Sequence, residues 1–482
     1  MPYIAKLEKA SVPTVIIDFE DQLNMIRHTG LEYGVPNARV VHSSRTIPGP
    51  EDVENWVEAV LEGLTKPLTK KEKDGGRYAP SQKRILFEGT LDDAQTFYQQ
   101  SRIVPVPVNA PICVYTDGLP IIVPTEEKVK EMLTGTSHEP DELITHQRTV
   151  EAPAGFAGIG ITRQKGDAVK FHPNEWTATV EKVATIAVMA GCKPEHLPVV
   201  LAIAESGCRT GTTVMNSQAV CLSGPIVEEI RINTGCGMFG PGSPANAPIG
   251  RSYQLMAINL SGSVPGVNRM SSLGSPLNNG GTCFAEKAAG LPPGWLGLNE
   301  EYGFEKNESV VMVMGFEGGI SGRQFSPGGY RALQKSGHGA IARRLGVKGT
   351  PGPHNWLEYY IHSLWANREG PVALIMIAEM ARHLYDYGFK SKDEVYEWLW
   401  KKSFAPVSEY RNRSWPDMTT NGWMGIEPVS GKHWKEMADD FPVPLGGPNP
   451  ANNCIIVASS EEEICVNLEG GRGQAYSIDV WR

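Results

Sequence analysis

Apolar residues in the first hundred positions follow two alternating spacings. A β-branched run over 12–19 is typical of a buried strand, and residues 20–34 carry apolar side chains at helical spacing. The pattern then repeats, with strands predicted at 38–42 and 84–88 and helices at 49–64 and 91–100. Repeated strand–helix units of this length predict a small parallel sheet covered by helices.

The chain changes character after residue 100. Five prolines between positions 105 and 124 favour extended backbone, and Thr125 is placed to cap a helix over 126–133. We therefore expect three units, which are a small module at 1–104, a proline-rich connection with strands at 105–175, and a large α/β domain at 176–482.

The large domain begins with the most apolar stretch of the chain. Residues 177–190 are apolar at most helical positions, which predicts a buried helix, and Gly191 suits the left-handed position that ends it. Pro194 then starts a second apolar helix at 195–204. Further strands are predicted at 219–222, 310–314, 372–377 and 453–458, and further helices at 249–260, 330–345, 378–387 and 392–402. The predicted fold class is α/β, with a small N-terminal β-α-β module plus a larger α/β domain with glycine-rich loops. No internal repeat is visible when residues are compared position by position.

Composition narrows the class of protein. The 482 residues are 41% hydrophobic and 21% charged, as in globular proteins, and the net charge of −9 argues against a nucleic-acid partner or an anionic membrane. No run reaches the roughly 18 apolar residues of a membrane-spanning helix, and the first residues lack the pattern of a secretory signal. The eight cysteines include no Cys-x-x-Cys pair. We therefore expect a cytoplasmic protein without a membrane partner.

The boundary between the two buried helices offers a candidate reaction centre. Cys192 follows the first helix, and the amides at the start of the second helix, with Lys193 and His196 nearby, would lower the pKa of its thiol. The alternative is a small buried apolar side chain, which is the commoner fate of a free cysteine. Glu205 and Glu286 adjoin glycine-rich segments and could act as a general base and an orienting group, or each could form one salt bridge. The predicted catalytic residues are Cys192, His196, Glu205 and Glu286.

A glycine-rich loop at 233–250 leads into a predicted helix. In outline this arrangement is an anion site, although it matches neither the Walker nor the Rossmann pattern, and a loop that packs against the sheet is the alternative. A second such loop, at 315–329, carries Arg323. The histidines show no metal-binding spacing, so no metal site is indicated, and the sequence does not identify a cofactor. The predicted substrate-binding residues are Asp117, Gly118, Asn233, Gly240, Gly242, Asn246, Gly250 and Arg251.

Three blocks of sequence resemble a known family. The run Thr179–Ala202 (TVEKVATIAVMAGCKPEHLPVVLA) is similar to the large two-module proteins related to the UGSC-motif (seleno)proteins, and residues 115–133 and 240–252 are similar to two further blocks. The first hundred residues, within the module at 1–104, resemble the small UGSC-type α/β module. The resemblance implies redox chemistry that depends on a thiol or selenol. It departs from the family in two respects. No Cys-Gly-Ser-Cys motif is present and no cysteine precedes Cys113, and Pro244 and Pro248 alter the block at 240–252. Residues that map onto the shared blocks are Asp117, Gly118, Cys192, Glu195, Gly240, Gly242, Asn246 and Gly250.

Together these features predict an enzyme that transforms a small molecule. We expect a small organic, anionic substrate between the modules, with Cys192 as thiolate nucleophile or redox centre and His196 or Glu205 handling protons. One alternative is a non-catalytic subunit of a hetero-oligomeric enzyme. The other is a metal-dependent lyase or hydrolase. A homo-oligomer is consistent with the apolar and aromatic helices near 356–400.

Overall fold

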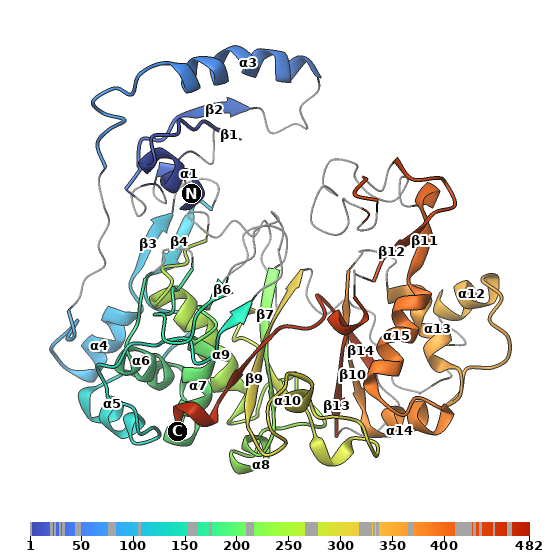
Figure 1. The fold of residues 1–482 in the computed structure, drawn as a ribbon. Helices are drawn as coiled ribbons and strands as arrows, with labels where there is room; N and C mark the ends of the chain where they lie inside the picture. Colours follow the sequence, from blue (N-terminus) through green and yellow to red (C-terminus); the bar gives the residue numbers. More distant parts are fainter. Residues whose placement is uncertain are drawn as a thin grey trace.

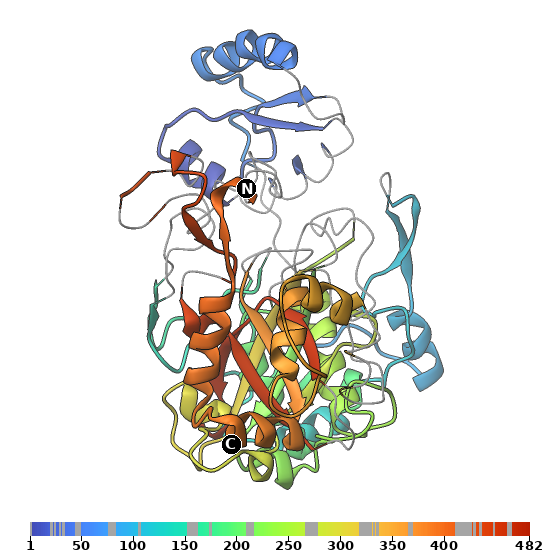
Figure 2. The same ribbon diagram turned by 90° about the vertical axis from the view of Figure 1, so that its right-hand side faces the viewer.

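The structure of the protein is a computed structural model. It describes residues 2–482 except 20–22, 24–25, 28–29, 31–33, 44–49, 76–82, 105–107, 152–161, 173–175, 209–215, 266–277, 318–329, 331–332, 334–336, 365–369, 410–426, 428–429, 433–435, 447–448 and 460–464. Most of the second glycine-rich loop, with Arg323, and most of the helix expected at 20–34 therefore lie outside the described residues. The first residues of that predicted loop, 315–317, instead belong to a strand. Figure 1 shows a large α/β body with a smaller N-terminal unit beyond one end of its sheets, and Figure 2 shows the same arrangement from the side.

The N-terminal unit contains a short parallel sheet. Helix α1 (Pro2–Lys9) precedes strand β1 (Ile16–Phe19), which pairs in parallel with β2 (Val40–Ser43), and α3 (Pro50–Thr65) packs against β2. The strand predicted at 84–88 is wrong, because these residues are not in a strand and none of the described strands pairs with them. Arg84 instead forms ion pairs with Glu126 and Glu181, both of which belong to the large body.

The residues that follow position 88 pack on the large body. Helix α4 (Leu91–Tyr98) stacks Phe97 on Tyr115, with ring centroids 5.3 Å apart. Strands β3 (Ser101–Val104) and β4 (Ala110–Cys113) form a hairpin, and α5 (Glu126–Leu133) begins at the predicted cap, where the Thr125 side chain accepts from the Lys128 amide. Contact with the body thus begins N-terminal to residue 104, where the sequence suggested a boundary. Two short strands follow, β5 (Val150–Glu151) and β6 (Thr162–Arg163).

Three buried helices cover one face of the first sheet. Helix α6 (Val180–Ala190) is capped by Thr179 and ends at Gly191, whose φ of 90° is left-handed as predicted. The next predicted helix is divided into a 3₁₀ turn, η2 (Pro194–His196), and α7 (Leu197–Ala204), and α9 (Asn246–Asn259) packs on both α6 and α7. Their side chains form one apolar core with the near face of the sheet.

Two mixed sheets lie face to face. The first has the order β15 (Gln474–Ser477), β9 (Val310–Glu317), β7 (Asn216–Ser223) and β8 (Cys283–Ala285), and the second has the order β13 (Cys454–Ala458), β10 (Val372–Ile377) and β14 (Cys465–Glu469). Alternate residues of both sheets form the apolar layer between them, for example Phe284 and Met312 from the first sheet and Ile375 and Ile456 from the second.

Helices complete the outer layer on the other side. The second sheet is covered by α13 (Trp356–Leu364), α14 (Ala378–Tyr387) and α15 (Lys392–Lys402), with α12 (Gly337–Arg344) packed on α13. The order of layers is helix, sheet, sheet, helix (Figure 1). Elements outside these layers are α8 (Ile226–Glu229), η4 (Ala288–Gly290), α10 (Leu298–Glu301), β11 (Phe404–Pro406), β12 (Pro442–Pro444), η7 (Pro450–Asn452) and η8 (Asp479–Trp481).

The two sheets share one topology. In the first, β7 is followed after a helical crossover by the parallel neighbour β8, and then by the antiparallel neighbour β9 on its other side. In the second, β10 is followed after α14 and α15 by the parallel neighbour β13, and then by the antiparallel neighbour β14. A repeat of topology is therefore present although the sequence shows none. Among the described helices, none is both long and apolar enough to cross a membrane.

Candidate functional site

Cys192 lies in the corner between α6 and α7. Its amide donates to the Ala187 carbonyl oxygen at 2.9 Å, which closes the end of α6. Its side chain belongs to the core beneath the first sheet, and burial raises the pKa of the Cys192 thiol well above its usual range. The lowered pKa expected at this position is therefore wrong, because loss of hydration outweighs the helix amides and the exposed Lys193.

The His196 side chain forms a hydrogen bond with the backbone of the same corner. Its Nδ1 accepts from the Lys193 amide at 3.2 Å, and burial lowers the pKa of the imidazole. Within the described part of the chain, no hydrogen bond joins His196 to Cys192. The structure therefore does not bring the two residues together as a nucleophile and its base.

Most of the remaining thiols are also buried. Six of the eight cysteines are buried, whereas Cys113 is half-buried and Cys236 is exposed. Burial raises the pKa of the thiols at positions 208, 221, 283, 454 and 465 as well. Cys236, in the glycine-rich loop, is thus the best-exposed thiol of the chain.

Asp117 and Arg251 form a bidentate ion pair. Arg251 donates from Nε to Asp117 Oδ2 and from Nη2 to Asp117 Oδ1, both at 2.9 Å, and Nη2 also donates to the carbonyl oxygens of Leu119 and Pro120. The guanidinium therefore ties the turn at Gly118 to α9. The predicted role of Arg251, in which it holds an anionic group of a substrate, is not supported by these contacts.

The polar side chains of the glycine-rich loop bind the loop itself. Asn246 accepts from the Asn233 amide at 2.9 Å and donates to the Asn233 and Cys283 carbonyl oxygens, while Asn233 donates to the Cys236 carbonyl oxygen. A Cβ at Gly250 would lie 3.0 Å from the Thr282 nitrogen, so this glycine lets α9 approach the start of β8. Gly240 and Gly242 form the turn between these anchors, and Gly242 has a φ of 106°. These contacts correspond to the packing alternative for this loop.

Glu286 enters a buried network of charges. It lies immediately after β8, and its Oε1 lies 2.8 Å from Lys392 Nζ at the start of α15. The same ammonium lies 2.9 Å from Glu301 Oε2, and the other oxygen of Glu301 accepts from Arg472 and from the Tyr396 hydroxyl, each at 2.8 Å. Two carboxylates are thus matched by two cations.

This network joins the two halves of the sandwich. Glu286 and Glu301 lie between β8 and β9, whereas Lys392, Tyr396 and Arg472 belong to the segments around the second sheet. Burial alone would lower the pKa of Lys392, but the two carboxylates reverse the effect and hold it above its usual value. Lys392 is thus a buried cation held by two carboxylates, and Glu286 is one of the two.

Glu205 has a different environment. It ends α7, its side chain is 2% exposed, and its Oε1 accepts from the Gln147 amide at 2.8 Å. Its Oε2 accepts from the Trp481 indole N–H at 3.3 Å. Burial raises the pKa of Glu205 to about 7, against the opposing effect of these donors and of the cations Arg148 and Arg163. A carboxyl group that titrates near neutral pH can both take and release a proton.

A polar surface lies beside Glu205. Arg163 on β6 donates from Nη1 to the Gln474 side-chain oxygen at 2.7 Å and to the Tyr476 hydroxyl at 3.3 Å, and Tyr476 also donates to Gln474 at 2.9 Å. Arg163 and Gln474 are half-buried, and the guanidinium carbon of Arg148 lies 4.1 Å from the Phe304 ring centre. Among the predicted catalytic residues, Glu205 alone combines a pKa near 7 with neighbouring cations.

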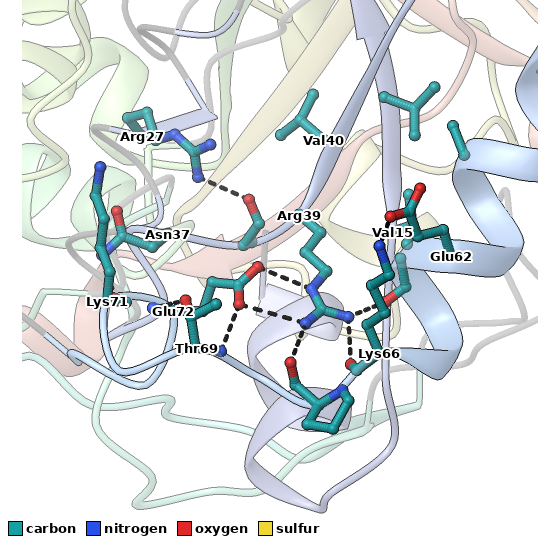
Figure 3. Close-up of a pocket in the computed structure, with 15 residues that line it drawn as sticks. Val15, Arg27, Asn37, Arg39, Val40, Glu62, Lys66, Thr69, Lys71 and Glu72 are labelled. Atoms are coloured by element: carbon teal, nitrogen blue, oxygen red, sulfur yellow. Dashed lines mark hydrogen bonds and ion pairs between the residues drawn. The ribbon is translucent and has the colours of Figure 1, made fainter.

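A hollow of about 540 Å³ lies in the N-terminal unit, between β2 and the residues that follow α3 (Figure 3). Its central cation is Arg39, which donates to Glu72, to Pro67 O and to the carbonyl oxygens of Gly63 and Lys66. This pairing lowers the pKa of Glu72 to about 2. The Arg39 guanidinium thus holds the turn after α3 and is not available to a ligand.

Sequence reasoning missed the partners of both carboxylates. Lys392 stands in a charged run at a helix start, which is typical of an exposed position, and Trp481 lies next to the last residue of the chain. No local signal connects them to Glu286 or Glu205. Within the described residues, no three His, Cys, Asp or Glu side chains are grouped as metal ligands are. No family model, curated protein or solved structure matches the chain.

Proposed function

We propose that this chain is an enzyme that moves a proton to or from a small anionic molecule, with Glu205 as general acid and base. The observation that supports the proposal is the setting of Glu205, a buried carboxyl whose pKa is about 7 and which lies near two arginines. Proton transfer by a side chain is most efficient when its pKa is close to the working pH. Perturbed carboxyl groups of this kind gather at functional sites.

Arg163 would hold the anionic group of the substrate. Its Nη1 is used by Gln474 and Tyr476, and no partner for its Nε or Nη2 is found in the described part of the chain. Those N–H groups can form the paired hydrogen bonds that a carboxylate or phosphate accepts. Arg148, which is exposed, is a second cation whose charge acts on Glu205.

Thiol-dependent redox chemistry, which the family resemblance implies, remains a second proposal, but it would use a cysteine other than Cys192. Cys192 and the other buried thiols are poor nucleophiles because burial disfavours their thiolates. A thiol reaction would need Cys236 or Cys113, the two cysteines that are not buried.

The proposed reaction can be tested by measuring the exchange of carbon-bound hydrogen in candidate substrates for deuterium from the solvent. The full chain is incubated in D₂O with a panel of small carboxylic acids and phosphate esters, and replacement of C–H by C–D is read by NMR. We expect exchange in at least one compound, and a loss of about 100-fold or more in Glu205→Gln. Arg163→Lys should weaken apparent binding, because lysine cannot form the paired hydrogen bonds.

The control is Glu286→Gln, which changes the other predicted carboxylate. A variant that keeps its far-ultraviolet circular dichroism should retain exchange, since Glu286 is assigned to the structural network. Exchange that survives in Glu205→Gln at the wild-type rate would overturn the role of Glu205. No exchange with any compound of the panel would count against the proposed reaction.

A further inference from the structure

Helix α3 carries an apolar stripe that its own unit leaves uncovered. Val53, Val57, Leu61 and Leu64 are spaced by four, four and three residues, so they lie on one side of the helix. Their exposed fractions are 49%, 50%, 55% and 36%. The face that packs inward is a neighbouring one, where a Cβ at Gly63 would meet Val15. The stripe is therefore an extension of the apolar face beyond the part that β1 and β2 cover.

Acidic residues border this stripe. Glu54 and Glu58 follow Val53 and Val57 by one position each and are exposed. They line, together with Val57 and Leu61, a hollow of about 650 Å³ along the helix. A partner surface that fits this stripe therefore needs apolar side chains bordered by positive charge.

Helix α12 of the same chain has that composition. Its buried side includes Ala342, which is 0% exposed, whereas Ile341 and Leu345 are 41% and 62% exposed. Arg344 precedes Leu345, and Lys348 follows three residues later, both exposed. Ile341 and Arg344 lie three positions apart on one side of α12, and Leu345 and Lys348 lie in the residues that directly follow the helix.

Within one folded chain, α3 and α12 lie too far apart to cover each other's apolar residues. Figure 1 shows α3 along the outer edge of the N-terminal unit and α12 on the flank of the large body, and the side view in Figure 2 also separates them. A pairing of α3 with a second α3 is disfavoured, because antiparallel helices would bring their acidic borders together.

We propose that α3 of one copy packs against α12 of a second copy. In a two-fold dimer this contact occurs twice, once in each direction, so both apolar stripes are covered without leaving a free edge. Val57 and Leu61 would contact Ile341 and Leu345 of the other copy, and Glu58 would lie near its Arg344. The inference is independent of the reaction assigned to Glu205.

The first test measures mass in solution. Size-exclusion chromatography with light scattering, on the full chain at micromolar concentrations, should give twice the chain mass of 52.6 kDa. Leu61→Asp and Leu345→Asp should each weaken the dimer by about 30-fold or more in Kd. Leu296→Asp is the matched control, because Leu296 is 49% exposed and lies in neither helix. A monomeric wild-type chain, or a dimer that both variants leave unchanged, would overturn the proposal.

The second test distinguishes this pairing from any other apolar contact. A mixture of the Leu61→Asp and Leu345→Asp chains keeps one intact α3–α12 contact, so it should dimerise more strongly than either variant alone. Glu58→Arg and Arg344→Glu should each weaken the dimer, and the double variant should regain at least part of the loss. No gain in the mixture, together with no rescue in the double variant, would contradict the assigned partner helices.

Discussion

Lys392 Nζ lies 2.8 Å from Glu286 Oε1, and the contact joins the two halves of the sandwich. The side chains are 2% and 0% exposed, so neither charge is compensated by water. Removal of the cation would leave Glu286 and Glu301 buried with one positive partner fewer. Removal of one partner alone should therefore destabilise the junction strongly, whereas replacement of the whole pair by well-packed apolar side chains should be nearly neutral.

Lys392→Met should lower the free energy of unfolding of the large body by about 3–5 kcal/mol. Urea denaturation, followed by tryptophan fluorescence, measures the change. Lys401→Met on the same helix is the control, since its pair with Glu397 is exposed and should contribute less than about 1 kcal/mol. A loss at Lys392 no larger than that at Lys401 would contradict the structural role of the network.

Glu205 should make stability depend on pH in one direction. The folded protein holds the Glu205 proton more firmly than the unfolded chain does, because burial raises the pKa from 4.5 to about 7. Its contribution is therefore fully present below pH 4.5 and is lost as the pH rises to about 7. Relative to Glu205→Gln, the wild type should lose up to about 3 kcal/mol over this window. Denaturation of both chains between pH 4 and 8 measures the difference, and parallel curves would refute the raised pKa.

Gly281 should tolerate a methyl group far less well than Gly118 does. Both have left-handed backbone, with φ of 71° and 92°, but a Cβ at Gly281 would lie 2.0 Å from the Gly250 oxygen, whereas nothing lies within 4 Å at Gly118. Each alanine pays about 1–2 kcal/mol for its backbone conformation. Gly281→Ala adds an overlap between α9 and the start of β8, so we expect it to cost about 2 kcal/mol more. Equal melting temperatures would show that this close approach is absent.

The cysteines should differ sharply in reactivity. Cys236 is exposed and Cys192 is buried, so a brief treatment of the folded chain with iodoacetamide should label Cys236 well before Cys192. Peptide mass spectrometry reads the sites, and the unfolded chain, in which both react, is the control. Early labelling of Cys192 would restore it as a candidate reaction centre.

Local sequence determined most of the elements of this protein. The strand at 372–377 and the helices at 126–133, 378–387 and 392–402 have the predicted bounds, because apolar spacing, caps and glycine act over a few residues. The strand expected at 84–88 failed for the opposite reason. Its residues have strand composition, but Arg84 is held by Glu126 and Glu181, and none of the strands in the described part of the chain pairs with these residues.

Only the tertiary structure decided which residues meet. Glu205 was identified from the sequence as a carboxylate near glycine, yet its raised pKa depends on burial beside Gln147 and Trp481, which are 58 and 276 positions away. Cys192 illustrates the same point, since the charges next to it in sequence favoured a thiolate whereas its packing in the core disfavours one. Both side chains lose their hydration through contacts with segments that are distant in the sequence. Neighbouring residues in the sequence therefore reveal the helices, the strands and the candidate groups, but not the protonation state of those groups.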